Sequence, residues 1–137
     1  MLLRLSLIVS VLLSVPGAIA VGDDADVPDP ELRKVLEKIL RKKDVKEKFF
    51  TTENLKKIWF LDASNRNIED ITGLEHCYNL GEVRLNGNAI RDVSPLGELR
   101  NIQSLNLADD RIVDPAPLGK IKKLQYLRLD GNAIQKV

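Results

Sequence analysis

The chain has 137 residues, enough for one folded domain but not for two large ones, and its formal charge of +1 argues against a nucleic-acid binder. Hydrophobic residues make up 44% of the chain and aromatic residues only 4%, so the apolar content is mostly aliphatic. Leucine alone accounts for 22 residues. A single cysteine excludes an intramolecular disulfide, and with a single histidine it excludes a zinc site built from Cys and His.

Residues 1–20 have the three-part layout of a secretory signal. A short charged start ends at Arg4, and an apolar run from Leu5 to Val15 follows it. Pro16-Gly17 then breaks any helix, and Ala18-Ile19-Ala20 is the small-x-small pattern that signal peptidase accepts. The apolar run is shorter than the roughly 20 residues that a membrane span needs. We therefore expect cleavage after Ala20, no membrane span in the mature chain, and a secreted or cell-surface protein.

Residues 21–28 are polar and contain proline, which predicts a short linker. A helical cap is predicted over residues 29–58, beginning at Asp29-Pro30-Glu31 with a capping carboxylate and a proline at the first helical position. A second short helix is expected to begin at Thr51-Thr52-Glu53 and to run to about Ile58. In the first helix, apolar side chains recur at helical spacing: Leu32, Val35, Leu36, Ile39 and Leu40.

Basic residues gather towards the end of the first predicted helix. Positive charge near the C-terminal end of a helix interacts favourably with the helix dipole. We therefore interpret these residues as a solvated helix face rather than as a binding patch. The residues are Lys34, Lys38, Arg41, Lys42 and Lys43.

Residues 59–137 repeat with a period of 22 residues, which is the strongest signal in the sequence. Each unit reads L-x-x-L-x-L-x-x-N-x-I and then I/V-x-x-L-x-x-L, the pattern of a leucine-rich repeat. We expect about three and a half units, with no C-terminal cap after Val137. One of the aliphatic columns consists of Leu61, Val83, Leu105 and Leu127.

The physical reason for such columns is that no single unit can bury its apolar face. The L-x-L alternation makes a short strand with its leucines pointing inward, and stacked coils share one core. We therefore predict an α/β fold: a leucine-rich-repeat right-handed solenoid with a short parallel sheet, preceded by a small helical N-terminal cap. Pro95 and Pro117 predict an extended convex side rather than a long helix.

A polar position follows each strand, and an asparagine there can both donate to and accept from neighbouring turns. Asn88 and Asn132 occupy it, whereas Arg66 and Asp110 depart from it. An ionised aspartate can only accept, so we expect an imperfect polar ladder at Asp110.

Several segments resemble internalin-type bacterial leucine-rich repeats. Residues 61–68 and 71–75 are similar to a first coil, and Val93-Ser94-Pro95-Leu96 is similar to the repeated convex stretch of that family. Residues 28–32 and 51–55 resemble its N-terminal cap, while Pro115-Ala116-Pro117 departs from the family pattern. The resemblance implies an exported protein that binds other proteins through its concave sheet.

Three columns of residues are expected to face the concave side of this sheet. They are Phe60, Glu82, Ser104 and Tyr126; Asp62, Arg84, Asn106 and Arg128; and Ser64, Asn86, Ala108 and Asp130. Asp62 could pair with Arg84, and tyrosine and arginine are enriched at binding hot spots. The residues predicted to bind a protein partner are Phe60, Asp62, Glu82, Arg84, Asn106, Tyr126 and Arg128.

We expect no catalysis, no cofactor and no metal site. Cys77 occupies a column with Leu99 and Ile121, so we interpret it as a small buried hydrophobe, and His76 beside it has no evident partner. Acidic residues also recur with the same period, and we expect them to make turn hydrogen bonds rather than to bind calcium. They are Asp70, Asp92 and Asp114.

Two alternatives to a concave protein-binding face stay open. The first is a structural role, with self-association through the uncapped last coil, since solenoids normally need a polar terminal cap. The second is that the chain is a truncated fragment of a larger cell-surface protein whose activity lies elsewhere. The residues expected on the uncovered coil are Leu127, Leu129, Ile134 and Val137.

Overall fold

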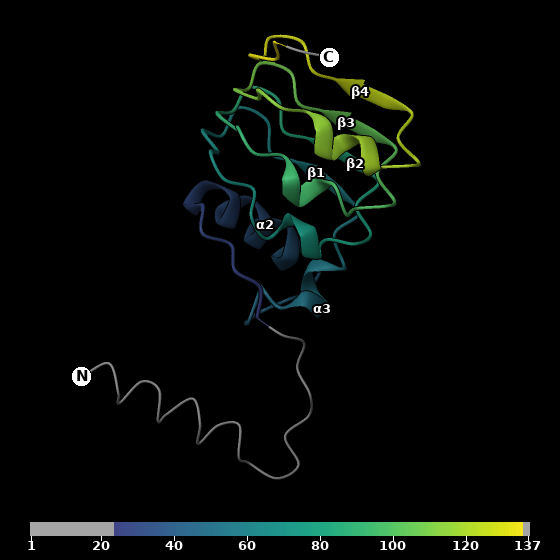
Figure 1. Ribbon diagram of the computed structural model, residues 1–137. Helices are drawn as coiled ribbons and strands as arrows, with labels where there is room; N and C mark the ends of the chain where they lie inside the picture. Colours follow the sequence, from purple (N-terminus) through teal and green to yellow (C-terminus); the bar gives the residue numbers. More distant parts are fainter. Residues whose placement is uncertain (1–23, 136–137) are drawn as a thin grey trace, which may run out of the picture.

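The computed structural model describes residues 24–135, so the predicted signal sequence and Val137 lie outside the described residues. Within this range, helix α2 (Pro30–Lys42) and the short helix α3 (Thr52–Leu55) precede a stack of coils (Figure 1). Each coil contributes one short strand to a parallel sheet with the order β1-β2-β3-β4. The strands are β1 (Phe60–Asp62), β2 (Glu82–Arg84), β3 (Ser104–Asn106) and β4 (Tyr126–Arg128).

The register of the sheet follows the sequence period. Leu61 pairs with Val83, Val83 with Leu105, and Leu105 with Leu127. The first three of these side chains are buried in the core, while Leu127 on the last strand is 40% exposed. The predicted leucine-rich-repeat solenoid, with its short parallel sheet and inward-pointing aliphatic column, is therefore confirmed.

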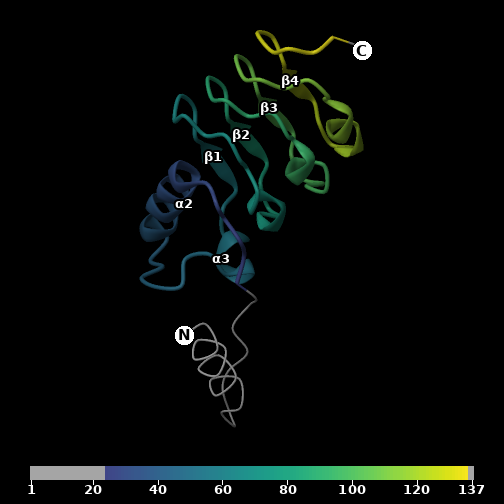
Figure 2. The same ribbon diagram turned by 60° about the vertical axis from the view of Figure 1, so that its left-hand side comes forward.

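The other side of the coils carries short 3-10 helices that stack in a second column (Figure 2). They are η1 (Leu74–His76), η2 (Ser94–Leu96) and η3 (Ala116–Lys120). Pro95 and Pro117, from which we predicted an extended convex side rather than a long helix, lie in the first turns of η2 and η3. The absence of a long helix at these positions is confirmed, but the backbone there forms short 3-10 helices rather than an extended segment. Proline fits a first helical turn because its missing N–H would have no partner there and its φ is already helical.

The amide of Asn88 joins two successive coils. Its Oδ1 accepts hydrogen bonds from the backbone N–H groups of Arg66 (2.9 Å) and Ile68 (3.1 Å). Its Nδ2 donates to the carbonyls of Ala63 (2.9 Å) and Leu85 (2.6 Å). Because both donors and acceptors are used, this side chain satisfies buried backbone groups that the short strands leave unpaired.

The cap covers the first end of the solenoid core. Helix α2 buries Leu32, Leu36 and Leu40, as the apolar spacing of its sequence requires. The Oδ1 atom of Asp29 accepts from the N–H groups that begin this helix, and the Thr51 hydroxyl caps α3 by accepting from Asn54 N at 3.1 Å.

Residues 24–28, which the sequence predicts as part of a linker, are packed against the cap. Ala25 and Val27 are buried, and Ala25 N donates to the carbonyl of Phe50 at 2.6 Å. Gly73 has φ 107° and lies so close that a Cβ there would stand 2.6 Å from Cγ2 of Val27. Alternate residues of this segment point inward, as in a strand, and that alternation is easily overlooked in a short, polar, proline-containing stretch.

Candidate functional site

The residues predicted to bind a partner lie on neighbouring strands of one sheet face. Cross-strand pairing joins Phe60 to Glu82 and onward to Tyr126 through Ser104, and it joins Asp62 through Arg84 and Asn106 to Arg128. Phe60 is 47% exposed and Tyr126 is 72% exposed, so both rings present apolar surface to the solvent. The sheet therefore brings the predicted residues together along one face, with an aromatic side chain near each end.

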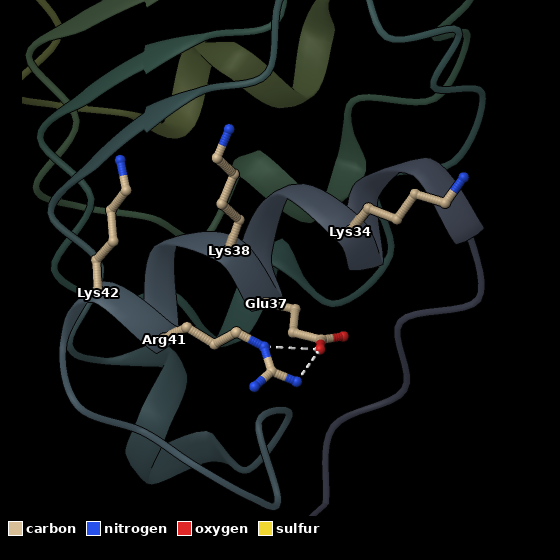
Figure 3. A pocket seen from close by; sticks show the side chains of 5 residues that line it. All are labelled: Lys34, Glu37, Lys38, Arg41 and Lys42. Atoms are coloured by element: carbon tan, nitrogen blue, oxygen red, sulfur yellow. Dashed lines mark hydrogen bonds and ion pairs between the residues drawn. The ribbon is translucent and has the colours of Figure 1, made fainter.

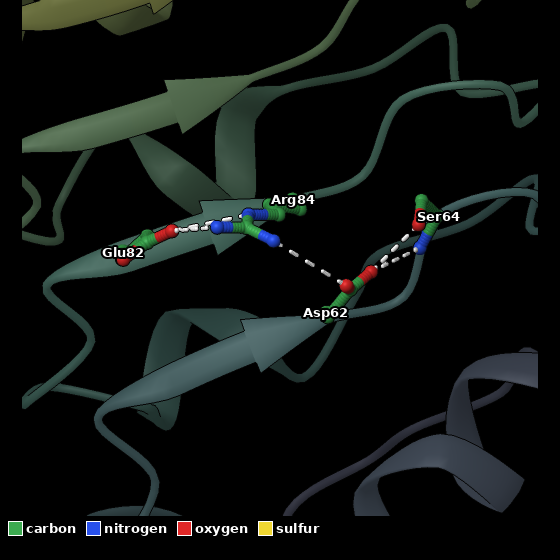
Figure 4. A network of polar contacts seen from close by, with 4 residues as sticks. All are labelled: Asp62, Ser64, Glu82 and Arg84. Carbon is green, nitrogen blue, oxygen red and sulfur yellow. Dashed lines mark hydrogen bonds and ion pairs between the residues drawn. The ribbon is translucent and has the colours of Figure 1, made fainter.

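At the β1 end of this face, Arg84 lies between two carboxylates (Figure 4). Its Nη2 and Nε atoms donate to Glu82 Oε1 at 2.7 and 3.0 Å, and its Nη1 lies 3.8 Å from Asp62 Oδ2. The predicted pair with Asp62 exists, but the shorter contact is with Glu82. The guanidinium also stands 5.4 Å from the centre of the Phe60 ring, within cation–π range.

Asp62 is held in place by its own turn as well as by Arg84. Its Oδ1 accepts from the hydroxyl of Ser64 at 2.6 Å and from the backbone N–H of Ser64 at 3.2 Å. The Ser64 hydroxyl, followed by the Ser64 N–H and the charge of Arg84, holds the pKa of Asp62 below its ordinary value despite partial burial. The carboxylate is thus ionised at neutral pH, and this end of the face has a defined arrangement of alternating charge.

At the other end, Arg128 makes a two-point contact with Asp130. Its Nη2 lies 2.9 Å from Oδ2 of Asp130, and its Nε lies 3.1 Å from Oδ1. Asp130 belongs to the third predicted column, in which Ala108 is buried and presents no surface. The third column therefore contributes less to the face than we expected from the alternation alone.

Trp59 is an exposed aromatic residue that the sequence reasoning did not include. It precedes β1, is 67% exposed, and lies beside Phe60 in the chain. The Nζ atom of Lys43 stands 5.6 Å from the centre of its ring. Trp59 is the one tryptophan of the chain and directly precedes the first predicted strand, and these two features could have identified it from the sequence.

Cys77 and His76, the residues considered for chemistry, lie outside this face, at the end of η1. Cys77 is fully buried, and burial, with a smaller effect from the charge of Glu75, raises the pKa of its thiol to about 12. It therefore packs as a neutral side chain, as its column predicted, rather than acting as a nucleophile. His76 next to it has a buried Nδ1 without a hydrogen-bond partner in the described chain, and its Nε2 lies 3.7 Å from a Glu75 oxygen.

The periodic aspartates make the turn hydrogen bonds that we predicted. Asp70 Oδ1 accepts from the N–H and hydroxyl of Thr72, Asp92 Oδ1 does the same with Ser94, and Asp114 Oδ1 accepts from the N–H of residue 116. Among residues 24–135, no cluster of three or more His, Cys, Asp or Glu side chains is placed to hold a metal ion. In the same range, no helix is long and apolar enough to cross a bilayer.

No family model and no curated protein matches this sequence. The fold is similar to that of internalin InlF from Listeria monocytogenes, with 29% identity and a TM-score of 0.73 over 80% of this chain and 32% of the other. The functional domain of InlJ from the same organism shows 22% identity and a TM-score of 0.69, over 88% of this chain and 27% of its own. A leucine-rich-repeat protein of Leptospira interrogans shows 24% identity and a TM-score of 0.54, over 63% and 29% of the two chains.

The stacked coils and these likenesses define a leucine-rich-repeat fold. More particularly, the chain has the internalin-type fold, in which a helical cap precedes the coils, as the sequence resemblance indicated. The chain spans about a third of the length of the internalin InlF structure that it matches, 32%.

Proposed function

We propose that this chain is an exported protein-binding module, that it binds its partner through the concave face of the sheet, and that it performs no catalysis. The observation that carries the proposal is the set of exposed aromatic and arginine side chains on one rigid sheet face, with Phe60 47% and Tyr126 72% exposed. Aromatic and arginine side chains dominate the energetics of protein interfaces. The internalin-like neighbours support a protein-binding repeat module in general terms.

Preorganisation adds to this argument. Arg84 and Arg128 are already held by carboxylates, with closest contacts of 2.7 and 2.9 Å. Exposed pairs of this kind contribute only about 0–1 kcal/mol to folding, so their value is in fixing the direction of the side chains. A partner that contacts a side chain already held in position loses less conformational entropy on binding.

Export is the second part of the proposal. It rests on the signal layout of residues 1–20, where a charged start and an apolar run precede Ala18-Ile19-Ala20. The described core is aliphatic and holds no paired cysteine, so its stability comes from packing and from the polar ladder rather than from disulfides. Appearance of the chain outside the cell with residue 21 as its first residue would test the cleavage site directly.

The concave face is tested by removing three of its side chains at once. We expect the variant Arg84→Ala/Tyr126→Ala/Arg128→Ala to bind a protein partner, identified by crosslinking to the wild-type chain, at least about tenfold more weakly. Affinity is measured by surface plasmon resonance. The matched control Arg91→Ala/Arg100→Ala/Tyr78→Ala removes the same side-chain types outside this face and should bind within about twofold of wild type. Equal affinity for the two triple variants would refute the proposal.

A second candidate function is assembly through the last coil, and one observation favours it. All of β4 is exposed, and Leu127 is 40% exposed whereas its equivalent Leu105 is 1% exposed. An open strand edge with an apolar side chain can pair with another chain. In this case sedimentation velocity should give a mass that rises with concentration, and Leu127→Lys should return the chain to monomer. A monomer at all concentrations would exclude assembly.

A further inference from the structure

Helix α2 carries a row of lysines on the side that faces the first coil. Lys34, Lys38 and Lys42 follow one another at intervals of four residues along the helix, and Glu37 and Arg41 lie beside this row on the same exposed surface (Figure 3). Residues four apart are neighbours on a helix surface, about 6 Å apart along its axis. The three ammonium groups therefore follow one another along the helix.

This row of lysines borders a groove between α2 and the first coil. The groove has a volume of about 270 Å³. Val35 and Ile39, both half-buried, lie between the lysines and supply an apolar floor, and Arg66 of the first coil lines the opposite wall. The cap groove, as we call it, thus combines apolar surface with cations on both walls.

The charges inside the cap groove are only partly compensated. Glu31 pairs with Lys34 at 2.7 Å, and Asp62 is engaged by Ser64 and Arg84 on the concave face. Within residues 24–135, no carboxylate lies within ion-pair distance of Lys38, Lys42 or Arg66. Beside this row of lysines, by contrast, Arg41 is paired with Glu37 at 2.6 Å. Lys38, Lys42 and Arg66 therefore line the groove without an ion-pair partner among residues 24–135.

The lysines are exposed, as the sequence predicted for a solvated helix face, but the groove beside them adds two features. A solvated face needs neither an apolar floor nor a second wall, and the cap groove has both. We propose that the cap groove binds an acidic amphipathic helix of a protein partner, with an acidic residue at every fourth position and an apolar residue beside it. The carboxylates of such a helix recur about every 6 Å along its axis, which matches the spacing of the lysines. Its apolar side chains would pack against Val35 and Ile39.

A protein segment fits this groove better than a nucleic acid or a membrane does. Phosphate backbones and anionic lipid surfaces call for a broad field of positive charge, whereas here the cations are few and alternate with apolar side chains. The mature chain is also balanced overall, since the formal charge of the full sequence is only +1. The proposal concerns the cap and does not depend on the concave face.

The test uses the mature chain and a synthetic helical peptide with Glu-Leu pairs repeated every four residues, labelled for fluorescence anisotropy. We expect saturable binding that weakens as salt is added, and at least a tenfold loss of affinity in Lys34→Glu/Lys38→Glu/Lys42→Glu. The matched control Lys120→Glu/Lys122→Glu/Lys123→Glu carries the same change in net charge elsewhere and should bind within twofold of wild type. Circular dichroism checks that both variants remain folded, and Lys→Gln at the three cap positions should give an intermediate loss.

Several outcomes would overturn the proposal. Equal losses in the two triple variants would mean that the peptide responds to net charge alone. Tight binding of a scrambled peptide of identical composition would remove the role of spacing. Binding of duplex DNA or phosphatidylserine vesicles in place of the peptide would assign the groove to another class of partner. A cap triple variant that keeps wild-type affinity for the peptide would place the site elsewhere. The variant Tyr126→Ala/Arg128→Ala, which changes only concave-face residues that do not line the cap groove, should bind this peptide normally, which separates the two proposals.

Discussion

Replacing Asp29 with alanine is expected to lower the free energy of unfolding by about 3 kcal/mol, more than the loss of an ordinary helix cap. The reason is that both carboxylate oxygens are used. Oδ1 accepts from the N–H groups of Glu31 (2.9 Å) and Leu32 (3.0 Å) and so caps α2. Oδ2 accepts from the N–H groups of Glu69 (2.9 Å) and Asp70 (3.1 Å) in the first coil, so one side chain joins the cap to the solenoid.

The pH dependence of this loss follows from the pKa of Asp29. Burial alone would raise that pKa, but the four N–H groups stabilise the ionised form and hold it below the ordinary value of 3.8. A carboxyl with a depressed folded-state pKa stabilises the fold above its unfolded pKa, and this stabilisation is lost as the pH falls through the folded value. The difference between wild type and Asp29→Ala should thus be constant near neutral pH and shrink below about pH 4.

Urea denaturation followed by far-ultraviolet circular dichroism measures this difference. Asp29→Ser should recover part of the loss, because a serine hydroxyl can cap α2 but is too short to reach the first coil. Asp26→Ala is the matched control, since Asp26 is an exposed aspartate in the same segment and should change stability by less than about 0.5 kcal/mol. A loss in Asp29→Ala no larger than in Asp26→Ala would contradict the bridging role.

The helix cap at Asp29 could be predicted from sequence, but its second role could not. An aspartate before proline and glutamate is a local signal, whereas the bonds to Glu69 and Asp70 join residues 40 and 41 positions apart. Local patterns carry no information on such contacts. The same limit applies to residues 24–28, whose burial depends on where Gly73 lies in the folded chain.

The candidate binding face was predictable to a greater extent, because a strict repeat converts sequence distance into spatial neighbours. The pairing of Phe60 with Glu82 and of Asp62 with Arg84 follows directly from the period of 22 residues. The choice that Arg84 makes between Glu82 and Asp62 depends on rotamers, which the period does not determine. The cap groove was not predictable either, since it arises from the way α2 is placed beside the first coil.

At one position of the polar ladder, Asp110 replaces the asparagine found in other coils, and this replacement leaves a buried carboxylate oxygen without a hydrogen bond among the described residues. Asp110 is only 7% exposed, its Oδ1 accepts from Ile90 N at 3.1 Å, and its Oδ2 is buried without a hydrogen-bond partner in the described chain. One coil later, the Nδ2 of Asn132 donates to the carbonyls of Leu107 (2.7 Å) and Leu129 (2.9 Å). The period therefore places Oδ2 of Asp110 where a donor is required.

Asp110→Asn is expected to raise the free energy of unfolding by about 2 kcal/mol at pH 7, because it supplies that donor and removes a buried charge. Burial is the main reason that the pKa of Asp110 is raised to about 6, and the charge of Asp109 adds to it, while N–H groups of Ile90 and Asn88 oppose the rise. The ionised form is thus unfavourable in the folded chain, and the protonated form can donate as asparagine does.

The gain from Asp110→Asn should itself depend on pH. Between the unfolded pKa near 4 and the folded value of about 6, the folded wild type binds a proton that the unfolded chain has lost. Its stability therefore falls as pH rises through this range and levels off above it. The asparagine variant lacks this slope, so its advantage should be small at pH 4 and reach its full size by pH 7.

Chemical denaturation at pH 4, 5, 6 and 7 measures the slope in both proteins. Asp109→Asn is the control, because it removes a negative charge from an exposed neighbour without supplying the missing donor. It should change stability by less than about 0.5 kcal/mol. An advantage of Asp110→Asn that stays the same from pH 4 to pH 7 would mean that the carboxyl is not protonated in the fold. A destabilised variant would mean that Oδ2 already has a donor, and the third coil would then need a different account of its buried carboxylate.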